Sequence, residues 1–143
     1  ILGRYKKFTE QDGYTIDLRA DGDYYVYADK IKITQVLYNL LNNAIAYTGE
    51  DKKITIRVRR SKNAVRVDVI DTGEGIPPEK LGMIWDRYYK LDKTHKRAKI
   101  GTGLGLSIVK EIIEQHGAWY GVDSQVGVGS QFWFALPLAE DQL

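Results

Sequence analysis

Hydrophobic residues change their spacing along this chain, and that change constrains the fold more than any other feature. Two segments place them at helical spacing, residues 30–47 and a second from about Leu104 to Gln115. Six segments have the composition and spacing of short strands: 14–19, 24–27, 53–60, 64–70, 118–124 and 131–137. The order is ββα, ββ, loop, α, ββ, which predicts an α+β fold: a mixed, mostly antiparallel sheet with helices on one face.

Capping and turn residues support these boundaries. Asp29 is placed to cap the first long helix, and Gly49 lies just beyond its end. The residues 61–63 (SKN) separate two strands and predict a hairpin turn. Pro77 is expected to open a short helix.

Length and composition predict one domain over residues 1–143, with 1–13 as a segment close to a linker. The chain has 143 residues, of which 43% are hydrophobic, and this suffices for one core. It begins at Ile1 and its one methionine is Met83, so we expect a piece of a longer protein. A net charge of +2 argues against a nucleic-acid binder, and the lack of cysteine excludes disulfides and thiolate metal sites. No apolar run is long enough to span a membrane.

A polar row on the first helix is the first candidate site. Gln35, Asn39 and Asn43 recur every four residues and therefore share one face. Asparagine is a mediocre helix former, so this cluster needs a reason. Either the row is a solvated face, or the amide oxygens of Asn39 and Asn43 bind a magnesium ion whose charge is balanced by phosphates.

The stretch DTGEGIP is the second candidate. Asp71 follows directly after a buried-looking strand, and Gly73 and Gly75 come next. These residue types also make ordinary turns. The functional alternative is a fixed carboxylate that accepts a hydrogen bond from a ligand, with glycines that allow its close approach.

The stretch GTGLGL is the third candidate. It is neither GxGxxG, because Leu106 stands where that pattern needs Gly or Ala, nor a GxxxxGK[ST] loop. Gly101, Gly103 and Gly105 nevertheless lead into a helix N-terminus, which is suited to bind an anion. A flexible hinge is the alternative. The preceding residues 86–100 carry six Lys or Arg against two Asp, which suits either a solvated loop or a mobile cationic lid.

In this order NLLNNAIAYT, DTGEGIP, GTGLGL and GVGSQFWFALP resemble the ATP-binding catalytic domain of bacterial sensor histidine kinases. These belong to the gyrase, heat-shock-chaperone, histidine-kinase and MutL ATPase superfamily. The resemblance runs from about Tyr14 to Leu138 and implies a two-layer α/β sandwich with ATP held between the helices and a lid.

The resemblance implies ATP and Mg²⁺ as ligands. Asn43 and Asn39 would bind the metal, and Asp71 would read the adenine amino group. It implies no catalytic side chain in this chain, because the phosphoacceptor histidine and its neighbouring acid lie on another domain. His95 and His116 are interpreted as non-catalytic. The residues expected to contact the nucleotide are Asn39, Asn43, Tyr47, Asp71, Gly73, Gly75, Ile76, Arg87, Tyr88, Lys90, Gly101, Thr102, Gly103, Leu104, Gly105, Leu106 and Ser130.

One position departs from the family pattern, and another separates branches of the superfamily. Family members often place a phosphate-binding lysine where this chain has Ala46, so either the triphosphate is held more weakly or Arg87 and the lid lysines compensate. Ala46→Lys should then tighten ATP binding more than adenosine binding. Hydrolytic members place a glutamate base where this chain has Asn39, and an amide cannot take a proton from water. This favours a kinase over a hydrolytic machine.

The expected function is therefore a part of two-component signal transduction. The domain would bind Mg-ATP and supply the γ-phosphoryl group for autophosphorylation of a histidine on a separate dimerisation domain. A response regulator would receive the group next, and the parent would be a homodimeric membrane sensor with this domain in the cytoplasm. No nucleic-acid partner and no membrane insertion are expected. The alternative is a regulatory or degenerate ATP-binding module of the same fold, such as an anti-sigma-type serine kinase.

Overall fold

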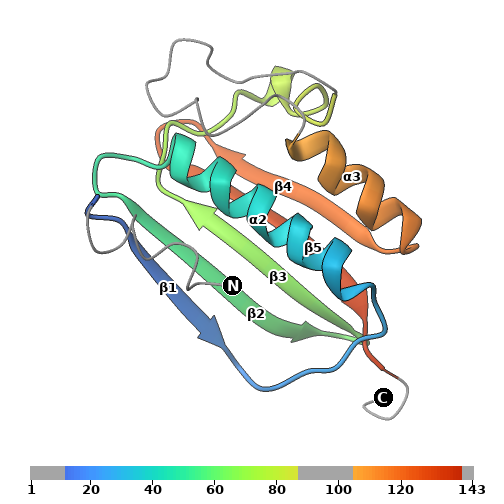
Figure 1. The fold of residues 1–143 in the computed structure, drawn as a ribbon. Coiled ribbons are helices and arrows are strands. Elements are labelled where there is room, and N and C mark those ends of the chain that lie inside the picture. Colours follow the sequence, from blue (N-terminus) through green and yellow to red (C-terminus); the bar gives the residue numbers. More distant parts are fainter. Residues whose placement is uncertain (1–11, 87–104, 140–143) are drawn as a thin grey trace.

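The computed structural model describes residues 12–86 and 105–139, which form a five-stranded sheet with two α-helices across one face (Figure 1). The helices are α2 (Lys30–Tyr47) and α3 (Gly105–Gln115), and one 3₁₀ turn, η2, covers Pro78–Lys80. The strands are β1 (Thr15–Ala20), β2 (Lys53–Ser61), β3 (Ala64–Asp71), β4 (Trp119–Gln125) and β5 (Gly129–Pro137). The predicted two-layer α+β architecture is confirmed.

The strands lie in the order β1-β2-β3-β5-β4. β1 and β2 are parallel, because α2 carries the chain back across the sheet between them, and the other pairs are antiparallel. The predicted hairpin after β2 is present: Ser61 pairs with Ala64, and Lys62 adopts a φ of 57° in the turn. In the central pair, the register places Asp71 at the end of β3 opposite Ser130 near the start of β5.

The core fills the space between the helices and the sheet. Each fully buried Leu, Ile or Phe side chain stabilises the fold by roughly 1.5–3 kcal/mol relative to an exposed one. Because β-strand side chains alternate between faces, one face of each central strand enters this core. Its least exposed members are Val36, Leu40, Leu41, Ala44, Ile45, Ile54, Val69, Ile76, Ile84, Val109, Ile113, Phe132 and Phe134.

The predicted cap of α2 is confirmed, and it also joins the two helices. The Asp29 carboxylate accepts hydrogen bonds from the backbone N–H of Ile31 (3.0 Å) and Lys32 (3.1 Å). The Asp29 N–H donates to His116 Nε2 (3.1 Å), while His116 Nδ1 lies 2.8 Å from Ile112 O. A neutral imidazole that donates from Nδ1 satisfies both contacts. His116 therefore has a structural role at the end of α3.

The strand predicted at residues 24–27 is wrong. Only Val26 makes a bridge, to Leu138, and the Ala139 N–H donates to Tyr25 O (2.8 Å). Tyr25 and Tyr27 are 67% and 76% exposed. Their composition suits a strand, but β5 is already paired on both edges, so only the residues beyond its end remain available to this segment.

A cluster of charged side chains occupies the sheet face opposite the helices. Asp68 on β3 is fully buried, and its Oδ1 accepts from Arg66 Nε (2.9 Å) and from Gln131 Nε2 (2.8 Å). Its Oδ2 lies 3.4 Å from Arg57 Nε and 3.7 Å from Arg59 Nε. A buried carboxylate is tolerated where cations and donors surround it, and this one has both.

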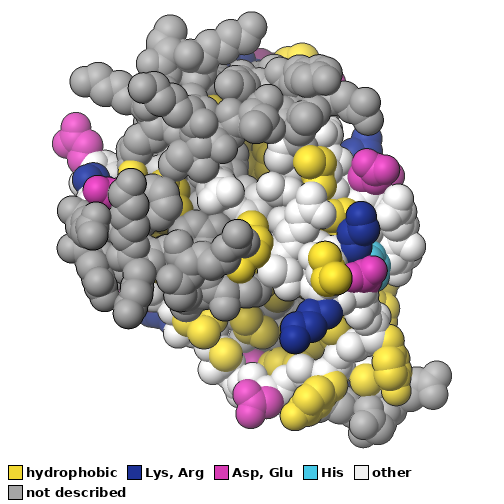
Figure 2. Space-filling model, viewed as in Figure 1, with side chains coloured by type: hydrophobic (Ala, Val, Ile, Leu, Met, Phe, Trp, Pro, Cys, Tyr) yellow, Lys and Arg dark blue, Asp and Glu magenta, His cyan; other side chains and the backbone are white. Residues whose placement is uncertain are grey.

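The face that carries the helices shows charges of both signs. In Figure 2 the described Lys and Arg side chains on this face are interspersed with Asp and Glu side chains and with hydrophobic ones. Among the described residues, no helix combines the length and the apolar character that crossing a bilayer requires.

Candidate functional site

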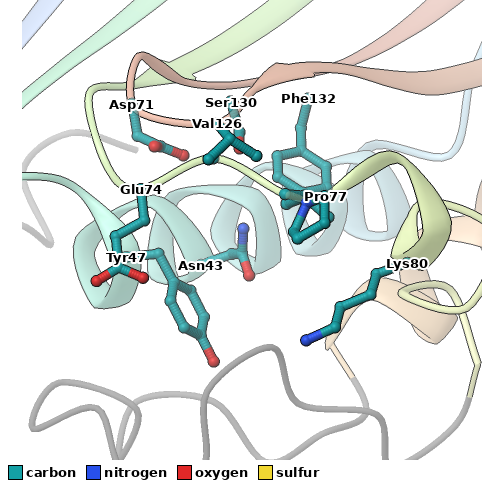
Figure 3. A pocket seen from close by; sticks show the side chains of 11 residues that line it. Asn43, Tyr47, Asp71, Glu74, Pro77, Lys80, Val126, Ser130 and Phe132 are labelled. Atoms are coloured by element: carbon teal, nitrogen blue, oxygen red, sulfur yellow. The ribbon is translucent and has the colours of Figure 1, made fainter.

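A pocket lies between the C-terminal half of α2, the loop that follows β3, and the start of β5. Figure 3 shows side chains from all three segments around it. The lining residues are Asn43, Tyr47, Asp71, Glu74, Gly75, Ile76, Pro77, Lys80, Val126, Ser130 and Phe132. Six of the predicted nucleotide contacts are thus brought together here: Asn43, Tyr47, Asp71, Gly75, Ile76 and Ser130.

Asp71 provides the buried carboxylate of this pocket. It is 4% exposed, and its Oδ1 accepts from the Gly73 N–H (2.9 Å). Burial raises the pKa of the Asp71 carboxyl from 3.8 to about 6, while backbone N–H groups of Gly73 and Ser130 oppose that rise. No basic side chain among the described residues forms an ion pair with it. At neutral pH it is therefore a largely ionised acceptor, held in place and available to a ligand donor.

Two serines attach the loop after β3 to the sheet. Ser124 on β4 accepts from the Ile76 N–H (2.7 Å) and donates to Gly129 O (3.1 Å). Its oxygen also lies 2.9 Å from Ser130 Oγ. Since Ser124 has a single hydroxyl proton, Ser130 is the donor in that last contact. Ser130 thus helps to fix the pocket wall together with Ser124, which was not predicted from the sequence.

Gly73 and Gly75 are required by backbone packing. A Cβ on Gly73 would lie 1.9 Å from Tyr47 O, and one on Gly75 would lie 2.3 Å from Gln125 O. Gly75 also has a φ of 78°, a conformation that favours glycine. Gly73 is not among the pocket-lining residues; its N–H orients Asp71 instead. These glycines bring the loop against α2 and against the β4–β5 turn.

The asparagine row leads from the pocket to the start of α3. Asn43 lines the pocket, whereas Asn39 lies one turn earlier on α2. The Nδ2 atom of Asn39 is buried and has no hydrogen-bond partner among the described residues. A Cβ on Gly105 would lie 3.9 Å from the Asn39 side chain, so the first residue of α3 faces Asn39. Leu106 packs against the hydrophobic core.

The remaining predicted contacts lie outside the described residues: Arg87, Tyr88, Lys90, Gly101, Thr102, Gly103 and Leu104. Trp85, near the end of the first described range, packs edge-on against Tyr120 (4.9 Å between ring centroids) and Phe132 (5.8 Å). It therefore anchors the segment after η2 to the core.

Five lining residues were missed: Glu74, Pro77, Lys80, Val126 and Phe132. Only the motif DTGEGIPPEK offered a signal for three of them, because it places Glu74, Pro77 and Lys80 directly after Asp71. Ala46, where the resemblance leads one to expect lysine, is 1% exposed. No cluster of three or more His, Cys, Asp or Glu suited to a metal occurs within the described ranges.

Comparisons with known proteins agree with this geometry. Residues 28–140 match the family model described as histidine kinase-, DNA gyrase B- and HSP90-like ATPase. The chain is 39% identical over 144 residues to the sensor histidine kinase WalK of Bacillus subtilis, covering 99% of this chain. It spans only 24% of the length of WalK.

Solved structures of histidine kinases have the same fold. The catalytic domain of histidine kinase ThkA superimposes with a TM-score of 0.82 at 33% identity, over 95% of this chain and 86% of that one. Full-length ShkA in complex with AMPPNP gives 0.81 at 27% identity, over 96% and 28% of the two chains. ThkA in complex with the response regulator TrrA gives 0.79 at 30% identity, over 99% and 39%.

Proposed function

The chain belongs to the histidine kinase-, DNA gyrase B- and HSP90-like ATPases, as an ATP-binding domain of the sensor histidine kinase type, and from that membership we propose its reaction. It binds Mg-ATP and supplies the γ-phosphoryl group to a histidine on a separate dimerisation domain. In that transfer a histidine nitrogen bonds to the γ-phosphorus while the bond to the β,γ-bridging oxygen breaks, and ADP leaves.

The observation that carries this proposal is the Asp71 carboxylate. It is buried, held by the Gly73 N–H, and faces a pocket whose other walls include Ile76 and Phe132. Such an acceptor between apolar walls suits an adenine ring, whose amino group donates a hydrogen bond while the ring is covered by apolar contacts. AMPPNP, an ATP analogue, is present in the structure of the related ShkA.

The asparagines suit a magnesium ion held mainly by phosphate. The buried Asn39 Nδ2 has no partner within the described part of the chain, which is costly for a polar group, and a phosphate oxygen would satisfy it. Asn43 lines the pocket one turn further on, and its amide oxygen is the type of ligand that Mg²⁺ accepts beside phosphate oxygens. The ion would neutralise charge on the phosphates, and Asn39 and Asn43 would hold it.

The same residues favour transfer to a partner over hydrolysis. Asn39 cannot act as a general base toward water. The chain would therefore deliver phosphate to the phosphoacceptor domain of a homodimeric membrane sensor, and a response regulator would take it from there, as the ThkA–TrrA complex suggests. Ala46 in place of a cation favours the second candidate, a regulatory or non-catalytic ATP-binding module.

Calorimetric titration with an ATP analogue, with and without Mg²⁺, tests the proposal. We expect binding in both cases and tighter binding with the metal, because the ion offsets phosphate charge near Glu74 and Asp71. Adding ATP labelled in its γ-phosphate, together with a purified dimerisation domain that carries the histidine, then separates the two candidates. Only the kinase would transfer the labelled phosphoryl group to that histidine. Failure to bind at millimolar nucleotide would overturn both.

A further inference from the structure

Lys80 is the one cation among the eleven described residues that line the pocket. It ends the η2 turn, where its N–H donates to Pro77 O (2.9 Å), and this bond fixes the backbone from which its side chain extends. Figure 3 shows the ammonium group directed toward the side of the pocket where Asn43 and Tyr47 lie. Lys80 is only partly buried and forms no ion pair with a described residue.

The other charges of the pocket are unfavourable for a polyanion. Asp71 and Glu74 are both acidic, and neither is within ion-pair distance of Lys80. The last turn of α2, which forms one wall, contains no basic residue. A phosphate chain that enters this pocket would meet two carboxylates, so it needs an unneutralised cation nearby.

We propose that Lys80 is the phosphate contact of the described pocket and sets its preference for phosphorylated adenine nucleotides over adenosine. This inference rests on the proposed function, because it assumes that the adenine group lies against Asp71. A lysine suits this role, since its flexible stem lets one compact charge follow a phosphate without a fixed geometry. The cation would thus come from the η2 turn after β3. In α2, this chain has Ala46 at the position where the resemblance leads one to expect a phosphate-binding lysine.

Titration of the whole chain with ATP, ADP and adenosine tests the inference. Lys80→Gln should weaken ATP binding by about tenfold, the effect of losing a hydrogen bond to a charged group. Adenosine binding should change by less than about twofold, because adenosine has no phosphate to lose a contact. Lys80→Arg should retain most of the preference for ATP over adenosine. The difference in ATP affinity between the wild type and Lys80→Gln should become smaller as the salt concentration is raised.

Lys32→Gln is the matched control, because Lys32 is exposed near the start of α2 and its loss changes net charge equally. It should leave both affinities unchanged. An ATP affinity that is unchanged in Lys80→Gln would overturn the inference, as would an equal fold-loss for both ligands, which would indicate a change in pocket shape. If the wild-type chain binds neither ligand, the proposed function fails instead.

Discussion

Two buried carboxylates lie three residues apart on β3 and face opposite sides of the sheet. Asp68 is fully buried on the outer face, where Arg57, Arg59, Arg66 and Gln131 surround it. Asp71 is 4% exposed on the helix side, and within the described chain its hydrogen bonds come from backbone N–H groups. β3 thus carries two buried carboxylates, of which Asp68 has cationic partners and Asp71 has none among the described residues.

The difference in partners separates a structural carboxylate from a binding one. Both carboxylate oxygens of Asp68 accept hydrogen bonds from side chains on β2, β3 and β5, so Asp68 holds these three strands together on the outer face. Asp71 is desolvated without a cation, so its charge is costly in the free chain and available to a ligand donor. Burial alone does not indicate function; burial with an incomplete set of partners does.

The largest effect should follow from Asp68→Ala. Removing one partner of a buried ion pair is strongly destabilising, but Arg57 and Arg59 are about 40% exposed and can rehydrate, so we expect a loss of about 3 kcal/mol. Urea unfolding measures it. Asp123→Ala is the control: this side chain is 71% exposed and 3.4 Å from Arg66, and its loss should cost under about 0.5 kcal/mol. Equal costs for the two variants would contradict the structural role of Asp68.

Asp71→Asn should produce the opposite pattern. Adenosine affinity should fall by about thirtyfold, because the hydrogen bond to a charged acceptor is lost. The free energy of unfolding at pH 8 should not fall and should rise by about 1 kcal/mol, since a buried charge is removed. Calorimetry and urea unfolding give the two values. Unchanged adenosine binding, or a stability loss as large as that of Asp68→Ala, would refute the distinction.

A smaller effect should appear when pH is varied. Burial raises the pKa of Asp71 from 3.8 to about 6 in the folded chain. Between about pH 4 and pH 6 the folded chain therefore keeps a proton on Asp71 that the unfolded chain has already released. Its contribution to stability is therefore present at low pH and is lost as pH rises through about 6.

Between pH 5 and pH 7 this loss amounts to about 1 kcal/mol, and adenosine affinity should rise about tenfold over the same range as Asp71 ionises. Differences between wild type and Asp71→Asn isolate both changes. Parallel profiles for the two proteins would show that Asp71 does not titrate in this range.

The fold could be predicted largely from local patterns. Periodicity located both helices, and Asp29 marked the start of α2 as expected. The segment 24–27 misled, because its aromatic residues have strand composition whatever partner is available. Whether a strand forms depends on a free sheet edge, and that is a property of the assembled fold.

The candidate site was predicted in part. Asn43 and Asp71 lie in recognisable motifs, and both line the pocket. Ser124 and Phe132 were missed, since each reaches the site from a strand that is distant in the sequence from Asp71, and Lys80 was missed although it lies in the same motif as Asp71. Gly73, which is predicted to contact the nucleotide, also packs closely against the backbone of α2, and no pattern in the sequence indicated that contact.

The pairing of β3 with β5 also bears on the order in which the chain folds. The β2–β3 hairpin closes a short loop, whereas the pairing of β1 with β2, from Thr15 to Lys53, closes a longer loop that contains α2. The Asp71–Ser130 register joins segments on either side of α3 and closes a loop longer still, and contacts between residues distant in the sequence form more slowly. We therefore expect the pocket to be completed late in folding, so that the gain of ligand binding reports the final step.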